Sequence, residues 1–142
     1  MEALKFQHSI RINRDQETVW KALTESEWTR KYMYGSDVHS SWEKGSTILW
    51  TGSYMGVSYS LKGIIKDIDP GQMLCYTNFD PASGLEDIED NYLTITYLLS
   101  SVDGVTEFTS ISENFKGNKA RYDEAKSGWE MVMETLKKVL EA

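Results

Sequence analysis

Apolar and polar residues alternate near the start of the chain, from Leu4 to Ile12. One face of this segment is apolar except for His8, and the other face is polar. Alternation with a period of two is typical of a β-strand with one buried face. We therefore expect a half-buried strand with His8 as the one titratable residue on its apolar face.

Two short helices are predicted directly after this strand. Asn13 and Thr24 are each followed three residues later by Gln or Glu, which is the spacing of a capping box. Because the second signal follows the first so closely, we expect a sharp break between two helices. The second helix is expected to bury Trp28 and Tyr32.

Strands joined by turns are predicted over residues 36–115. A long alternating run slips in phase before Ile68, and Gly63 inside it is typical of a bulge or a bend. Strong turn signals follow at 69–71, which reads Asp-Pro-Gly, and at 103–104, which reads Asp-Gly. These strands are too closely spaced for parallel crossover connections, so an antiparallel sheet is expected.

The last segment has the clearest pattern, because apolar residues recur at three- and four-residue steps from Tyr122 to Leu140. This period predicts an amphipathic helix from about Ala120 to Glu141, roughly 33 Å long at 1.5 Å per residue. Acidic residues come early in it and lysines late, as the helix dipole favours. Such a helix must bury its apolar face against the sheet.

This order of elements predicts an α+β fold in which a curved antiparallel sheet wraps around the long C-terminal helix. Two short helices follow the first strand. We expect one domain over residues 1–142. If the sheet curls strongly, helix and sheet cannot touch along their whole length, and the gap between them becomes a pocket.

Charge and composition narrow the range of partners. The 142 residues include 15 basic and 22 acidic side chains, a net charge of −7. We therefore expect neither nucleic acid nor an anionic membrane surface as a partner, because no positive field attracts phosphates. The single cysteine excludes an internal disulfide and a multi-thiolate metal site. With no apolar signal core at the start and no membrane-length apolar run, a cytoplasmic protein is expected.

Three motifs in order along the chain carry a family resemblance: Val19-Trp20-Lys21-Ala22-Leu23-Thr24, Gly63 before Ile68-Asp69-Pro70, and Gly128-Trp129 before Leu136-Lys137. Together they resemble the START-like, helix-grip superfamily. They look closest to its branch related to the C-terminal domain of the activator of the heat-shock protein 90 ATPase. The resemblance implies a sheet that grips the C-terminal helix around a hydrophobic cavity. It also implies a choice of functions that includes ligand binders, polyketide cyclases and a co-chaperone domain.

No metal site, cofactor or catalytic residue is assigned from the sequence. His8 and His39 lie far apart, and no clustered His or paired Cys motif is present. Cys75 falls inside a predicted strand, where a buried unreactive thiol is the usual outcome, although a Cys75–His8 pair stays open. Glu107 and Glu113 lie in the polar last strand and stay open as inward-facing acids.

Aromatic residues give the strongest candidate site. Tyr hydroxyls are costly to bury without partners and easier to satisfy around a cavity, although ordinary core packing remains the alternative for many of these residues. The expected ligand-binding residues are Trp28, Tyr32, Trp50, Tyr54, Tyr59, Phe79, Tyr97, Phe108, Tyr122, Trp129, Met133 and His8.

The leading hypothesis for function is a non-catalytic protein that holds a small hydrophobic or aromatic molecule between sheet and C-terminal helix. One alternative is a regulator that interacts with a chaperone ATPase, as the resemblance implies. A further alternative is a polyketide cyclase-like enzyme. The sequence leaves open whether the protein is a monomer or a homodimer.

Overall fold

The computed structural model describes residues 4–142, apart from the side chain of Tyr54. Within these residues seven strands form one sheet: β1 (Phe6–Ile12), β2 (Asp37–Ser40), β3 (Thr47–Tyr54), β4 (Val57–Asp69), β5 (Met73–Asn78), β6 (Leu93–Val102) and β7 (Val105–Glu113). The helices are α1 (Gln16–Thr24), α2 (Ser26–Tyr32), the short 3₁₀ helix η1 (Glu89–Asn91) and the long α3 (Lys119–Glu141). This order confirms the predicted α+β class.

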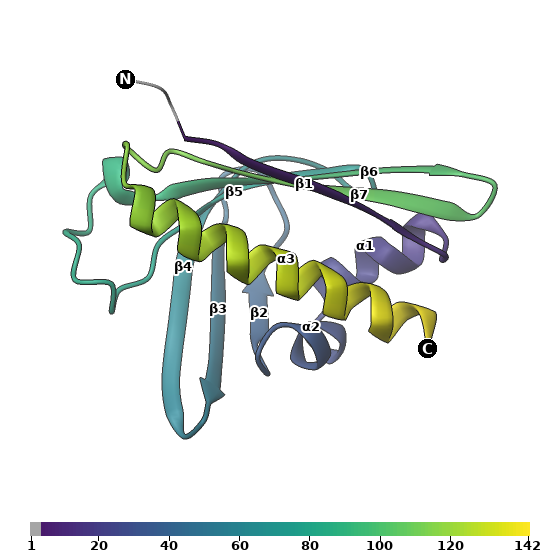
Figure 1. Ribbon diagram of the computed structural model, residues 1–142, viewed down its shortest axis with the longest axis horizontal. Helices are drawn as coiled ribbons and strands as arrows, with labels where there is room; N and C mark the ends of the chain where they lie inside the picture. The colour runs from purple at the N-terminus through teal and green to yellow at the C-terminus, as the bar shows by residue number, and fades with distance from the viewer. Residues whose placement is uncertain (1–3) are drawn as a thin grey trace.

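The sheet is antiparallel throughout, with the strand order β1-β7-β6-β5-β4-β3-β2. Figure 1 shows β3 and β4 running steeply to the direction of β1, β6 and β7, with α3 lying across them. The sheet therefore curves around the helix, as the order of elements predicts. No helix among the described residues is long and apolar enough to span a bilayer.

Strand β4 contains two features that allow the sheet to bend. The pairing of β4 with β5 shifts register between Ile65 and Asp67, which is a β-bulge. At Gly63, a Cβ atom would lie 1.6 Å from the carbonyl oxygen of Thr77, so only glycine allows the two backbones to come this close. The predicted bend at Gly63 and the slip in phase before Ile68 are therefore confirmed.

The helices begin at other residues than the capping pattern predicts. Asp15 is the N-cap of α1, and its carboxylate accepts from the backbone N–H of Thr18 at 3.1 Å. The prediction of Asn13 as the N-cap is therefore wrong, because Asp15 lies nearer the first turn and its short side chain also carries an acceptor oxygen. Thr24 is also not a cap: it closes α1, and α2 starts from Glu25 without a side-chain cap.

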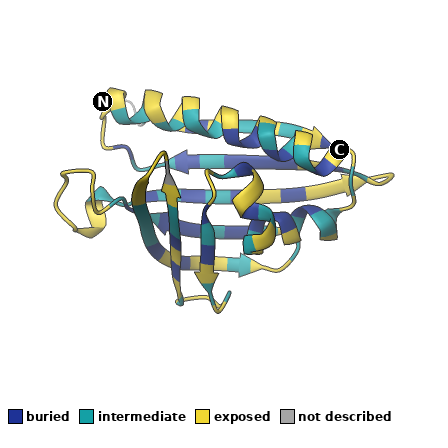
Figure 2. Cartoon of the chain, turned by 90° about the horizontal axis from the view of Figure 1, so that it is seen from below, coloured by how far each residue is buried: buried dark blue, intermediate teal, exposed yellow. Residues whose placement is uncertain are grey.

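Burial of α3 is uneven along its length. Its fully buried residues, Val132, Met133, Leu136 and Leu140, all lie in its second half. Figure 2 shows the same trend, with dark blue bands on the part of α3 toward the C-terminus. The first half of α3 packs less closely, because the curved sheet diverges from a straight helix. This divergence opens the space described next.

Candidate ligand-binding site

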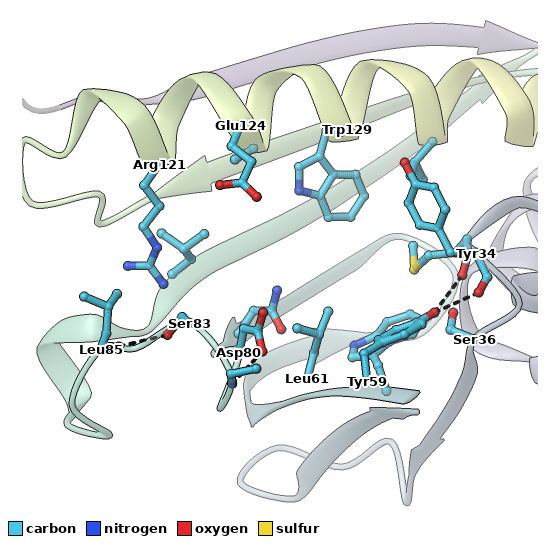
Figure 3. Close-up of a pocket in the computed structure, with 18 of the residues that line it drawn as sticks. Tyr34, Ser36, Tyr59, Leu61, Asp80, Ser83, Leu85, Arg121, Glu124 and Trp129 are labelled. Atoms are coloured by element: carbon cyan, nitrogen blue, oxygen red, sulfur yellow. Dashed lines mark hydrogen bonds between the residues drawn. The ribbon is translucent and has the colours of Figure 1, made fainter. Parts of the chain in front are cut away.

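A cavity of about 700 Å³ lies between the first half of α3 and strands β3, β4 and β5. We call it the helix–sheet cavity. Figure 3 shows Arg121, Glu124 and Trp129 pointing from α3 toward the sheet, where Leu61 and Tyr59 point back toward the helix. Loops at 33–36 and 80–85 close its two ends.

One part of the helix–sheet cavity is apolar. Trp50 and Leu61 line it from the sheet, and Trp129 and Val132 line it from α3. Trp129 is only half-buried, whereas Trp50 is 3% exposed, so the indole of Trp129 is the more accessible of the two. These side chains offer flat apolar surfaces on facing walls, an arrangement suited to an aromatic or aliphatic ligand.

Two buried tyrosines lie behind the cavity wall and connect Trp50 with Trp129. The hydroxyls of Tyr76 and Tyr97 are hydrogen-bonded at 2.8 Å, and their rings meet edge to face with centroids 5.4 Å apart. Tyr76 contacts Trp50 at 6.4 Å between ring centroids, and Tyr97 contacts Trp129 at 5.8 Å. Burial raises the pKa of both tyrosines, so both remain neutral. The two tryptophans are thus held in place by one packed aromatic group.

Tyr59 closes the end of the helix–sheet cavity nearest α2. Its ring lies over Gly52 on the neighbouring strand, where a Cβ atom would lie 2.6 Å from the Tyr59 hydroxyl. The hydroxyl donates to the backbone carbonyl of Tyr34 at 3.0 Å (Figure 3). Burial raises the pKa of Tyr59, and the nearby Ser36 hydroxyl opposes this rise. Tyr59 therefore keeps its proton near neutral pH and acts as a donor, not as a base.

The opposite end is polar. The Oδ1 atom of Asn78 is buried there and has no hydrogen-bond partner among the described residues. Arg121 donates from Nη2 to the carbonyl of Asn91 at 2.8 Å, and burial lowers its pKa while Glu124 opposes that change. Asp80 also lines this end, and its Oδ1 accepts from the N–H of Ala82. This end of the helix–sheet cavity therefore presents both hydrogen-bond donors and acceptors.

The cysteine and the two histidines lie away from the helix–sheet cavity. Cys75 alternates with the buried Leu74 and Tyr76 along β5, so it faces the outer side of the sheet, where Thr96 contacts its Sγ at 3.5 Å. Neither His8 nor His39 lines the helix–sheet cavity. Among residues 4–142, no three His, Cys, Asp or Glu side chains are grouped so as to hold a metal ion.

The structure brings three of the sequence-predicted site residues together on the cavity wall: Trp50, Tyr59 and Trp129. The side chain of a fourth, Tyr54, lies outside what the structure describes. A change of one position in strand register would have turned Trp50 or Tyr59 to the other face. Their common orientation is therefore a result of the tertiary structure.

The other predicted residues lie away from the wall. Tyr32, Tyr97, Phe108 and Met133 are buried in the core. Phe79 stacks on Tyr92 with centroids 4.8 Å apart, and Tyr122 packs against Phe115 at 5.4 Å. Trp28 is partly buried under the ammonium group of Lys31, and His8 lies beside Phe6 on β1. None of these residues lines the helix–sheet cavity, and their part in ligand binding stays a prediction.

Sequence reasoning missed most of the polar and small lining residues. Arg121, Glu124 and Gly128 follow one another at three- and four-residue steps, beside the apolar stripe of α3 rather than within it. The sequence does contain one signal for them: a glycine in the middle of a long predicted helix. The lining residues in loops, such as Asp80, have no periodicity from which to find them.

A second hollow, of about 870 Å³, lies on the outer face of β3 and β4. Leu49 and Ile64 form part of its floor, and both are more than a third exposed. Its rim carries a salt bridge from Lys62 to Asp87 at 2.5 Å, and Tyr92 donates to the same carboxylate. These charged groups already satisfy one another, so the helix–sheet cavity is the better candidate site.

A curved antiparallel sheet that grips a long C-terminal helix over a cavity defines the START-like, helix-grip class. Residues 13–141 match the family described as "Activator of Hsp90 ATPase homolog 1-like protein", and the chain belongs to this family. A comparison with curated proteins gives no match. The match to this family confirms the expected branch of the superfamily.

Solved structures agree with this assignment. The chain is similar to ChR145 from Cytophaga hutchinsonii, with 33% identity, a TM-score of 0.82, and coverage of 99% of this chain and 97% of that one. It has the fold of the Aha1 dimer from Colwellia psychrerythraea at 20% identity and a TM-score of 0.76, covering 97% and 96%. It also has the fold of CalU16 from Micromonospora echinospora at 16% identity and a TM-score of 0.70, covering 95% and 74%.

Proposed function

We propose that this protein binds a small hydrophobic or aromatic molecule in the helix–sheet cavity. The observation that carries the proposal is a cavity of about 700 Å³ whose facing walls present Trp50, Leu61 and Trp129. Apolar burial of the ligand supplies most of the affinity, at roughly 25 cal/mol for each Å² removed from water. A volume of this size is in the usual range for small-molecule sites.

The polar end orients the ligand. The buried Oδ1 atom of Asn78 needs a donor, and the half-buried guanidinium of Arg121 offers donors in return. A ligand hydroxyl satisfies both requirements, because it donates and accepts. We therefore expect an amphipathic ligand with its ring or chain between the tryptophans and a hydroxyl near Asn78.

The five tryptophans provide a direct test. In ¹H–¹⁵N NMR spectra of the labelled protein titrated with 2-naphthol, we expect the indole signals of Trp50 and Trp129 to shift. Trp20, Trp28 and Trp42 pack against the core outside the cavity, so their indole signals should not shift. No shift, or equal shifts in all five signals, would contradict the proposal.

A pair of matched variants locates the binding. Leu61→Gln places an amide on the cavity wall and should weaken 2-naphthol binding about tenfold, because burying a polar group without a partner costs about 1–3 kcal/mol. Leu49→Gln makes the same change on the outer face of the same hairpin and should leave binding unchanged. The reverse order of effects would place the ligand in the outer hollow.

Regulation of a chaperone ATPase is the second candidate function. Its support is the description of the family to which the chain belongs, together with the fold shared with the Aha1 dimer. Cyclase-like catalysis remains a third hypothesis. The residue on which it most depends, His8, lies beside Phe6 on β1 and not on the cavity wall.

A further inference from the structure

Gly128 stands in the interior of α3 and lines the helix–sheet cavity. Apart from its chain neighbours and the adjacent backbone of α3, a Cβ atom at this position would have no described atom within 4 Å, so it would enter open space. Gly63 and Gly52 differ sharply, because a Cβ atom there would lie 1.6 Å and 2.6 Å from its neighbours. Gly128 also has no positive φ. Neither packing nor backbone conformation requires a glycine here.

Glycine in a helix interior lowers stability relative to alanine, since it has the least favourable helix propensity after proline. Gly128 therefore destabilises α3, and no packing contact or backbone conformation in the folded chain requires it. Where activity needs a particular site geometry, a residue that lowers stability can be retained there. Gly128 lines the helix–sheet cavity together with its neighbours one turn away, Glu124 and Val132.

We propose that Gly128 is a ligand-contact residue that sets the clearance of the helix–sheet cavity. Without a side chain, the backbone of α3 is bare between Glu124 and Val132, and the flat face of an aromatic ligand packs against it beside Trp129. Any side chain at this position would project into the cavity and reduce its width. This inference rests on the proposed function and adds the residue that limits ligand thickness.

The test uses Gly128→Ala, Gly128→Leu and a matched control, Ser127→Leu. Ser127 is exposed and does not line the cavity, so its variant places the same side chain on the solvent side of α3. Binding of 2-naphthol is measured by isothermal titration calorimetry, and the melting temperature by differential scanning calorimetry. Each variant is the full chain.

Opposite changes in stability and binding are expected for Gly128→Ala. Its melting temperature should rise by about 3 °C, because alanine favours the helix. Its affinity for 2-naphthol should fall about threefold, and that of Gly128→Leu at least tenfold, because the added groups overfill the contact. Ser127→Leu should bind within about twofold of the unsubstituted protein, since it leaves the cavity as it is.

Three results would overturn the inference. Unchanged binding by Gly128→Ala and Gly128→Leu would show that no ligand contacts this part of α3. A lower melting temperature for Gly128→Ala would show that the glycine serves the fold. If the unsubstituted protein itself fails to bind 2-naphthol, the proposed function fails as well, so the two failures are distinguishable.

Discussion

Tyr76 and Tyr97 connect the two tryptophans of the cavity wall through one buried hydrogen bond. Their hydroxyls lie 2.8 Å apart, and neither has another hydrogen-bond partner among the described residues. Tyr76 contacts Trp50 and Tyr97 contacts Trp129, so the orientation of both indoles depends on this pair. A buried hydroxyl that loses its only partner is costly, which makes the pair a sensitive site.

We expect Tyr76→Phe and Tyr97→Phe each to lower the free energy of unfolding by about 1–2 kcal/mol, because each leaves one hydroxyl buried without a partner. The double variant should lose about as much as either single variant, since it removes both polar groups. Urea denaturation of all four proteins measures this. Losses that simply add would show that the two hydroxyls do not depend on each other.

At the scale of elements, the hairpin of β3 and β4 is fastened to the loop after α2. Gly52 leaves room for the ring of Tyr59, and the Tyr59 hydroxyl reaches the carbonyl of Tyr34 at 3.0 Å. This contact closes one end of the helix–sheet cavity (Figure 3). The hairpin tip beyond it is exposed, with Met55 86% accessible, and extends past the pairing of β3 with β2, which reaches Thr51.

Gly52→Ala tests this attachment. A Cβ atom at position 52 would lie 2.6 Å from the Tyr59 hydroxyl, so we expect the ring to move and its hydrogen bond to break. Backbone amides of β3 and β4 should then exchange with deuterium at least several-fold faster, as expected for an element that opens locally. Ser53→Ala, on the exposed neighbouring residue, serves as control. Equal exchange in both variants would rule out a fastening role for Tyr59.

For the molecule as a whole, the two leading functions make different demands. Ligand binding needs only the helix–sheet cavity, whereas regulation of a chaperone needs an external surface. For the chaperone hypothesis, the net charge of −7 predicts a partner with a basic surface. The family description and the shared fold support the second function without naming the surface.

ATP turnover separates the two functions. The chaperone hypothesis predicts that excess protein changes the rate of ATP hydrolysis by a purified Hsp90, and that Leu61→Gln, an internal change, leaves this effect intact. Ligand binding alone predicts an unchanged rate. An unaltered rate with excess protein would reject the chaperone hypothesis, while a change lost in Leu61→Gln would link the two functions through the cavity.

Much of the fold was predictable because its signals are local. Alternation over β1, the period of α3 and the glycine bend at Gly63 each depend on residues close together in the chain. The helix caps were not predicted correctly, because Asp15 and Asn13 offer similar acceptors two residues apart. The point at which the chain leaves β1 decides which of the two side chains caps the helix.

The sequence by itself determined the class of fold, the order of its elements and a high content of aromatic residues. Only the tertiary structure decided which of them face the helix–sheet cavity, because strand register and the curvature of the sheet assign each side chain to a face. Trp50, Tyr59 and Trp129 line it, while Tyr97 and Phe108 lie in the core. The polar end at Asn78 and the bare helix at Gly128 arise only where distant segments meet.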